Sequence, residues 1–191
     1  MPDLMPFDEL NRFEERLPDH FETDPDTGKR RIKSKQDYED ILDEMFDLFM
    51  MSYATGTAAT NIDLGSDVTH DVDTVIATID AEVAGQTWRQ RVRKYYEDGG
   101  DEADIMRIAT TESHRDSNAA AYNTAKKAGA VTKVWHCMLL PTSRDSHVWL
   151  DGVTAPIDGA FYNYKGESTF YPGQWGIAEE DVNCLCWLTY A

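Results

Sequence analysis

The first half of the chain carries apolar residues at the spacing of an amphipathic helix. From Ser34 onward these residues recur three or four positions apart, at Tyr38, Ile41, Leu42, Met45, Phe46, Phe49, Met50 and Tyr53. Ser34 and Asp37 precede this run with the spacing of a helix-capping pair. The pattern predicts a helix that begins near Ser34, and the small polar residues 54–67 predict a loop after it.

Two more long helices are expected before residue 130. The first covers residues 67–98, where Gly85 can interrupt it and Gly99 ends it. Its apolar positions are Val72, Val75, Ile76, Ile79, Val83 and Val92. The second covers residues 102–128 and ends at Gly129. We therefore expect a helical N-terminal half built from about three long helices.

Residues 1–33 differ from this helical region because prolines break any long helix there. The four prolines are Pro2, Pro6, Pro18 and Pro25. A turn is predicted at residues 24–28, and a short helix can form over residues 7–16. We interpret the segment as an acidic arm, either a flexible tail or a segment that becomes ordered against a partner.

The elements become shorter after Gly129. Residues 132–140, "TKVWHCMLL", and residues 181–190, "DVNCLCWLTY", are rich in β-branched and aromatic side chains and predict two strands. Residues 143–152 predict a helical turn, and turn-rich chain with several glycines and prolines follows it.

The predicted architecture is an α+β fold. A helical region at residues 34–100 follows the arm and leads to a small, irregular, antiparallel β-containing module at residues 101–191. Pairing of strand 133–139 with strand 183–190 is expected to close this module.

Composition and charge exclude several classes of function. The 191 residues include 35 acidic and 18 basic side chains, for a net charge of −17. Such a surface repels phosphates, so no direct or sequence-specific nucleic-acid binding is expected. The opposite hypothesis, that the charge mimics DNA and occupies a basic partner, is disfavoured because the acids are spread over ordinary amphipathic helices. No apolar run reaches the length of a membrane span.

Two of the three cysteines, Cys184 and Cys186, stand two residues apart near the end of the chain. The first residues lack the basic-then-apolar pattern of a secretion signal, so reduced thiols are expected. In an extended strand both thiols would face the same side, where a disulfide between them is strained. They are then either packed side chains or two ligands of a metal such as zinc.

A zinc ion needs about four ligands, so two more must come from elsewhere in the chain. His147 is the first candidate, and Cys137 and His136 are also available on the other predicted strand. The residues near His147 that could support or complete such a site are Arg144, Asp145 and Asp151. The spacing is not that of a zinc finger, so both hypotheses for the cysteines remain open.

A second polar cluster, "TTESHRDSN", falls within the predicted helix 102–128. Glu112, Arg115 and Asp116 lie at helical spacing, which favours a set of ion pairs over a catalytic site. Glu112 and His114 diverge by about 200° on a helix, so they do not form an acid–base pair. The chain contains no phosphate-binding glycine loop, no G-x-S-x-G motif and no H-E-x-x-H motif.

Four segments follow one another in the second half: "IATTESHRDSNAAAYNTAKKAG", "KVWHCMLLPTSRDSHVWLDG", "APIDGAFYNYKGESTFYPG" and "EDVNCLCWL". Together, over about residues 101–190, they resemble the phage Mu F-like head morphogenesis proteins, which are minor capsid proteins of tailed phages and prophages. The residues that fill the family's motif positions are Arg144, His147, Asp151, Gly152, Asn183, Cys184 and Cys186.

This resemblance implies a structural minor head protein that assists head morphogenesis and associates with portal and capsid proteins. It further implies an effect on DNA packaging or ejection, and a location in the virion head after assembly in the host cytoplasm. The family pattern also implies that His147, Cys184 and Cys186 gather around one site that holds a structural zinc.

The chain departs from the family pattern near this site. Leu140 and Thr142 stand where the family usually carries an acidic residue and a second arginine, and Leu185 replaces an arginine between the cysteines. We call the structural hypothesis a clip, in which His147, Cys184 and Cys186 hold the surrounding segments together. A clip tolerates such changes better than a catalytic site does, so we expect that the protein is not an enzyme.

The alternative is a small hydrolase or transferase that uses Arg144, His147 and Glu112, since relatives of this module occur in multidomain toxins. Geometry separates the two hypotheses. Catalysis requires His147 in an open pocket beside Arg144 and Glu112, whereas the clip places His147 against the two thiols.

Overall fold

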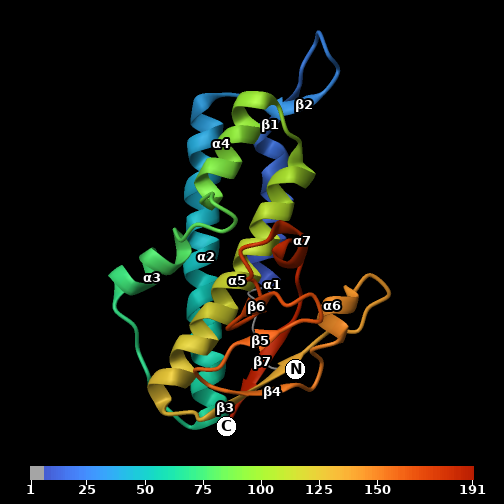
Figure 1. Ribbon diagram of the computed structural model, residues 1–191. Coiled ribbons are helices and arrows are strands. Elements are labelled where there is room, and N and C mark those ends of the chain that lie inside the picture. Colours follow the sequence, from blue (N-terminus) through green and yellow to red (C-terminus); the bar gives the residue numbers. More distant parts are fainter. Residues whose placement is uncertain (1–6) are drawn as a thin grey trace.

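A computed structural model describes residues 7–191, and residues 1–6, with Pro2 and Pro6, lie outside the described residues. A helical body carries a β-rich module along one side (Figure 1). The helices are α1 (Phe7–Arg16), the 3-10 helix η1 (Leu17–His20), α2 (Lys35–Leu64), α3 (Val72–Ile79), α4 (Trp88–Asp98), α5 (Glu102–Ala128), α6 (Asp145–Val148) and α7 (Ala178–Asp181). None of the helices in residues 7–191 is long and apolar enough to cross a bilayer.

The strands are short and antiparallel. They are β1 (Phe21–Thr23), β2 (Arg30–Ile32), β3 (Thr132–His136), β4 (Thr154–Pro156), β5 (Phe161–Tyr162), β6 (Ser168–Thr169) and β7 (Trp187–Tyr190). They form a three-stranded sheet in the order β4-β3-β7 and the two hairpins β1-β2 and β5-β6. The predicted α+β fold with a helical N-terminal half is confirmed.

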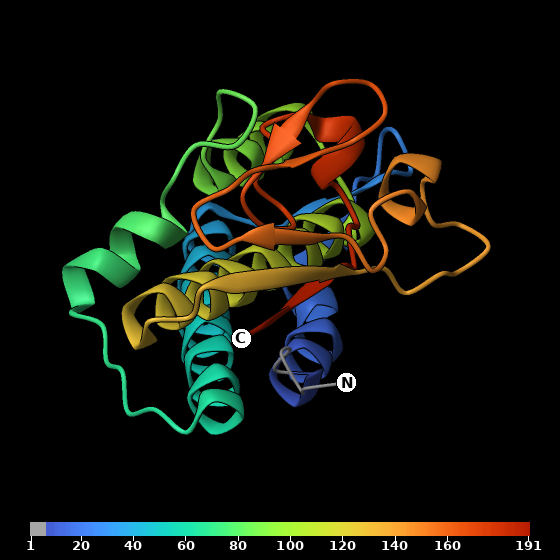
Figure 2. The ribbon, with the colours of Figure 1, turned by 60° about the horizontal axis from the view of Figure 1, so that its bottom comes forward.

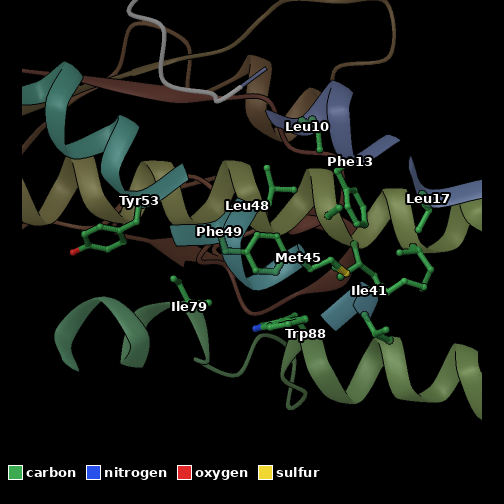
Figure 3. Packing of buried hydrophobic residues seen from close by; sticks show 14 of the residues in the cluster. Leu10, Phe13, Leu17, Ile41, Met45, Leu48, Phe49, Tyr53, Ile79 and Trp88 are labelled. Carbon is green, nitrogen blue, oxygen red and sulfur yellow. The ribbon is translucent and has the colours of Figure 1, made fainter. Parts of the chain in front are cut away.

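The helical body forms around α2 and α5, whose ends are defined by the sequence. The Ser34 hydroxyl accepts a hydrogen bond from the Asp37 amide at 3.1 Å and begins α2, as predicted. Asp101 and Asp104 form a reciprocal capping box at the start of α5, and the left-handed Gly129 ends it. Buried side chains from α1, α2, α3 and α4 meet in one core, where Trp88 packs edge-on against Phe49 (Figure 3).

The loop predicted at residues 54–67 is wrong, because α2 continues to Leu64. Ser52, Gly56 and Thr60 are buried at a spacing of four residues. They form a stripe of small side chains that lets α2 approach α5 closely. A Cβ atom on Gly56 would lie 2.2 Å from the backbone oxygen of Ser117 on α5. Small residues in this stretch therefore indicate a close helix crossing rather than a loop.

The helix predicted over residues 67–98 is two helices, α3 and α4, as the position of Gly85 allows. Ala84 and Gly85 have positive φ angles of 52° and 78°, and Val83 and Gln86 form a bridge across this turn. Asp71 caps α3, and Thr87 with Gln90 forms a capping box for α4. Each helix therefore has its own capping residues at its start, which the apolar pattern alone does not show.

Residues 7–33 are structured in place of the flexible tail that an arm implies. Leu10, Phe13 and Leu17 are buried in the main core, and Phe21 and Ile32 join them from the β1-β2 hairpin. This hairpin projects from one end of the helical body (Figure 1). The apolar side of α1 thus gains stability from α2 despite the prolines around it.

The predicted pairing of the two C-terminal strands is confirmed over a shorter length. β3 pairs with β7 from Lys133 opposite Tyr190 to His136 opposite Trp187. Three residues further on, Leu139 has a positive φ of 53°, so the chain has left the extended conformation there. Cys184 and Cys186 therefore precede β7 instead of lying within it. Figures 1 and 2 show the strands of the module gathered beside α5.

Lys133 is a buried cation at the junction of the sheet and α5. Its residue is 0% exposed, and its Nζ donates to the Phe170 carbonyl oxygen at 2.8 Å. The ammonium also lies over the rings of Tyr122, Phe161 and Phe170, at 4.6, 5.3 and 5.3 Å from their centres. Burial lowers the pKa of Lys133 to about 8.

The close crossing predicts the effect of Gly56→Ala. The added methyl collides with backbone that cannot rotate away, so unfolding free energy should fall by about 2 kcal/mol. Urea denaturation measures this free energy. The control Ala58→Ser, at an exposed position of the same helix, should change the unfolding free energy by less than about 0.5 kcal/mol. An unchanged midpoint for Gly56→Ala would contradict the crossing.

Lys133 predicts a pH-dependent stability. Below pH 8 both folded and unfolded chains hold the lysine proton, and the cost of a buried charge is fully present. Between about pH 8 and the ordinary value of 10.5, only the unfolded chain keeps the proton, so the stability of the folded chain rises with pH. Relative to Lys133→Met, the wild-type unfolding free energy should rise by about 2 kcal/mol from pH 7 to pH 10. A constant difference between the two proteins over this range would show that the ammonium is not desolvated.

Candidate functional site

The ring of His147 occupies the centre of a small buried cluster in the β-rich module. His147 lies on the short helix α6 and is 2% exposed. Its ring stacks on Trp175 at 5.8 Å and meets the edge of Trp135 at 5.9 Å between ring centres. The two indoles restrict the rotation of the imidazole, so each ring nitrogen has a defined direction.

One ring nitrogen faces both closing cysteines. Nδ1 of His147 lies 3.6 Å from Sγ of Cys184 and 3.4 Å from Sγ of Cys186. Both cysteines are buried, at 3% and 2% exposure. The structure thus brings together the three residues that the resemblance implied, in the arrangement that the clip hypothesis requires.

The two thiols converge through a turn, not through the extended strand that the sequence suggested. Asn183 between them and α7 adopts a positive φ of 55°, a conformation that asparagine tolerates better than most residues. Its amide donates to the Thr111 hydroxyl of α5 at 3.2 Å, and the Cys184 amide donates to the Asp181 carbonyl oxygen at 3.1 Å. Asn183 therefore shapes the segment that presents the thiols.

The other ring nitrogen faces a carboxylate. Nε2 of His147 lies 3.0 Å from Oε2 of Glu180, which is 1% exposed. The same carboxylate accepts a 2.7 Å hydrogen bond from the Ser146 hydroxyl and pairs with Lys165. Burial alone would raise the pKa of Glu180, but hydrogen bonds from Lys165 and Ser146 outweigh it and lower that pKa. Glu180 is therefore an anion that lies close to the far nitrogen of the ring.

The two thiols are not equivalent. A hydrogen bond from Cys186 lowers the pKa of Cys184, against the effect of burial and with help from His147. The same hydrogen bond and burial raise the pKa of Cys186. Cys184 is thus the first of the two to become a thiolate, the form that binds metals.

The remaining motif residues support the backbone around this cluster. The Arg144 guanidinium donates to the Val182 carbonyl oxygen. An Asp151 carboxylate oxygen accepts the Cys137 amide at 2.9 Å, and the Gly152 amide donates to the Trp135 carbonyl oxygen at 2.8 Å. Each of these three residues holds a backbone segment in place through a hydrogen bond, although Asp151 and Gly152 are exposed.

Asp181 performs a similar task for the turn before α7. Its carboxylate accepts the amides of Trp175, Gly176 and Ile177 at 2.9, 2.8 and 3.2 Å. Burial nevertheless raises its pKa to about 6. The sequence reasoning gave no role to Trp175 and Glu180, which lie in turn-rich chain without a recognisable spacing, or to Asp181, which it placed at the start of a predicted strand.

The pocket at this cluster is small. Its volume is about 40 Å³, and its wall includes Cys137, Arg144, His147, Cys184 and Cys186. One water needs about 10–15 Å³ measured in this way, whereas sites for organic ligands are typically several hundred Å³. The space suits a single ion or a few waters, not an organic substrate.

Glu112 lies in a different environment from the one that the enzyme hypothesis requires. It is 0% exposed and pairs with Arg91 and with Arg115, the latter at 2.7 Å. Arg115 also pairs with Asp116 at 2.8 Å and donates to the Ile79 carbonyl oxygen at 2.9 Å. The predicted ion-pair set is confirmed, although it is buried. Glu112 is absent from the pocket wall that Arg144 and His147 share.

Two more polar side chains of α5 join the helix to the cysteine segment. His114 Nε2 lies 2.6 Å from the Cys186 carbonyl oxygen, and the Asn118 amide donates to the same oxygen at 3.1 Å. The sequence reasoning did not assign them a role. The sequence did contain a signal for their role. "ESHRDSN" is polar on every face of its helix, whereas a helix with one side on the core and the other in solvent is apolar on its core side.

Comparison with known proteins identifies the family. The family model described as Phage Mu protein F like protein matches residues 73–189, more than half of the chain and the whole of the cluster around His147. The chain belongs to this family. The resemblance seen in the sequence over residues 101–190 is therefore confirmed and extends back to α3.

Two curated proteins match a smaller part of the chain. The minor head protein GP7 of Bacillus phage SPP1 is 35% identical over 86 residues, which are 43% of this chain and 28% of GP7. The NAD(+)–arginine ADP-ribosyltransferase EFV of Enterococcus faecalis is 35% identical over 85 residues, 42% of this chain and 17% of that enzyme. The chain thus spans less than a third of either relative. No solved structure gave a significant match.

The buried ion pairs predict the effect of Glu112→Gln. Loss of this carboxylate leaves two arginines with less compensating charge in a dry environment, so the unfolding free energy should fall by about 3 kcal/mol. Glu97→Gln breaks an exposed pair with Arg93 on α4 and should cost less than about 0.5 kcal/mol. Equal stability of Glu112→Gln and wild type in urea denaturation would refute a structural role for Glu112.

Proposed function

We propose that this chain is a structural minor head protein of a tailed phage or prophage, which assists head morphogenesis in association with portal and capsid proteins. The observation that carries the proposal is the family match, because it includes α5, the sheet and the His147 cluster together. The phage minor head protein family is structural, which agrees with the expectation of a non-enzymatic protein.

The geometry of the site supports a structural role over the enzyme alternative. His147 is buried against two thiols, and Glu112 belongs to a separate ion-pair network. The pocket beside His147, at about 40 Å³, is much smaller than a typical site for an organic ligand. The match to the ADP-ribosyltransferase covers too little of that enzyme to outweigh these observations.

In this role the protein acts through surfaces that contact partner proteins, and the cluster around His147 holds these surfaces in place. The segment between β3 and α6 projects from the module (Figure 2). It carries the exposed apolar side chains of Leu139 and Leu140, and two more, Val148 and Trp149, lie at the end of α6 and directly after it. Trp149 is 63% exposed and meets the edge of Tyr164 at 6.3 Å between ring centres. Exposed aromatic side chains of this kind are typical anchors of protein–protein contacts.

The net charge of −17 limits how the protein can influence the genome. An acidic surface repels the DNA backbone, so an effect on packaging or ejection would act through the portal or the shell rather than through direct contact with DNA. We propose a location in the virion head, with assembly into the head taking place in the host cytoplasm.

Quantitative mass spectrometry of purified proheads and mature particles tests the proposal. We expect the chain at a low, fixed molar ratio to the portal protein. Trp149→Ala should lower this ratio several-fold, because it removes the largest exposed apolar side chain of the projecting region. Ile62→Ala, at an 80% exposed position of α2, is the matched control and should leave the ratio unchanged. Absence of the wild-type chain from both kinds of particle would refute a head protein.

A further inference from the structure

We propose that the pocket beside His147 is a four-ligand structural zinc site, formed by His147 and all three cysteines of the chain, with Cys137 as the fourth ligand. The inference concerns the folding of the β-rich module and does not depend on the proposed function. Its starting point is that Nδ1 of His147 and the sulfurs of Cys184 and Cys186 all lie within 4.8 Å of one another and are buried.

The distances between these atoms match tetrahedral coordination. With Zn–S bonds of about 2.3 Å and a Zn–N bond of about 2.0–2.1 Å, a tetrahedral angle places nitrogen and sulfur about 3.5 Å apart. The two observed distances from Nδ1 are 3.6 and 3.4 Å. A neutral imidazole nitrogen has one lone pair and accepts one good hydrogen bond, yet two sulfurs face it. A cation between the three atoms explains this arrangement directly.

The surroundings of His147 are those of a metal ligand. Its Nδ1 faces the thiols, and its Nε2 faces the Glu180 carboxylate at 3.0 Å. A carboxylate behind the far nitrogen keeps the proton on that nitrogen and the lone pair on the metal side. Glu180 is thus a positioning residue, held in turn by Ser146 and Lys165.

Cys137 completes the donor set. It is 7% exposed and lines the same pocket as the other three residues. Asp151 holds its amide at 2.9 Å, just after β3 ends, which directs the residue to the pocket wall. Cys137 lies outside the set of atoms within 4.8 Å, so a change of its side-chain rotamer must accompany coordination. Among the described residues of this wall, it is the one remaining thiol.

The oxygen donors nearby are already engaged. The Asp151 carboxylate accepts the Cys137 amide, and the Asp181 carboxylate accepts three backbone amides. Zinc with three thiolates and one imidazole carries a net charge of −1, and Arg144, on the pocket wall, offers the compensating positive charge. A soft, tetrahedral donor set of this kind favours zinc over magnesium or calcium.

The site would connect three segments that are far apart in the sequence. Cys137 follows β3, His147 lies on α6, and the two closing cysteines precede β7. The core of the module is small, with nine buried residues that include the three cysteines themselves. Zinc binding would therefore supply folding free energy that this core lacks.

Metal analysis and cobalt substitution of the whole chain test the proposal. The chain purified under reducing conditions should contain one zinc per molecule. Co²⁺ in its place should show sulfur-to-metal charge-transfer absorption, and Cys137→Ser should lower this absorption by about one third while metal remains bound. His136→Ala, whose ring Nε2 lies 2.8 Å from the Thr189 hydroxyl, is the matched control and should change neither metal content nor spectrum.

Thiol alkylation of the wild type gives a second readout that no folding defect can obscure. Zinc should protect all three cysteines from iodoacetamide, and a chelator should expose Cys137 together with Cys184 and Cys186. Glu180→Gln should weaken zinc binding by about 10- to 100-fold in chelator competition. A folded chain that takes up no zinc would refute the site. An unchanged cobalt spectrum in Cys137→Ser, or alkylation of Cys137 alone in the zinc-loaded chain, would refute Cys137 as the fourth ligand.

Discussion

The burial of α5 on nearly every side is the constraint on which the other elements depend. Residues 111–122 are all buried although many are polar, and buried polar groups are costly unless they are paired. Arg115 meets this requirement through Glu112, Asp116 and the last carbonyl oxygens of α3, while His114 and Asn118 hold the Cys186 carbonyl oxygen. One helix therefore joins the helical body to the β-rich module through different faces.

Local signals in the sequence account for much of this fold. The capping pair located the start of α2, and Gly129 located the end of α5, because these features act within a few residues. The pairing of β3 with β7 was also foreseen. The continuation of α2 beyond residue 53 was not predicted. Gly56 is favourable in this helix because the backbone of Ser117 on α5 lies against it, and that contact is distant in the sequence. The packing of α1 on the body depends on the same kind of distant contact.

Some residues of the candidate site could be identified from the sequence, and others could not. Two cysteines two residues apart and a histidine in a short turn could be singled out from the sequence, and the resemblance linked them. Trp175 and Glu180 were not identified because turn-rich chain has no period that relates residues to a common face. Asp181 was not identified because it was assigned to the start of a predicted strand. Cys137 was considered only as one of several donors, because the strand pattern does not show that the chain turns toward the pocket after His136.

The departures from the family pattern lie around the pocket itself. Leu140, Thr142 and Leu185, where the resemblance led us to expect charged side chains, all line the wall shared by Cys137 and His147. Arg144 remains as the cation of this wall. Catalysis would require those charges at defined positions. The proposed structural centre depends on His147, the cysteines and the residues that hold them in place, so side chains on the rim can change without loss of that role. Leu140, which belongs to the projecting segment, and Leu185 are exposed on that rim, so variation there alters the surface offered to a partner.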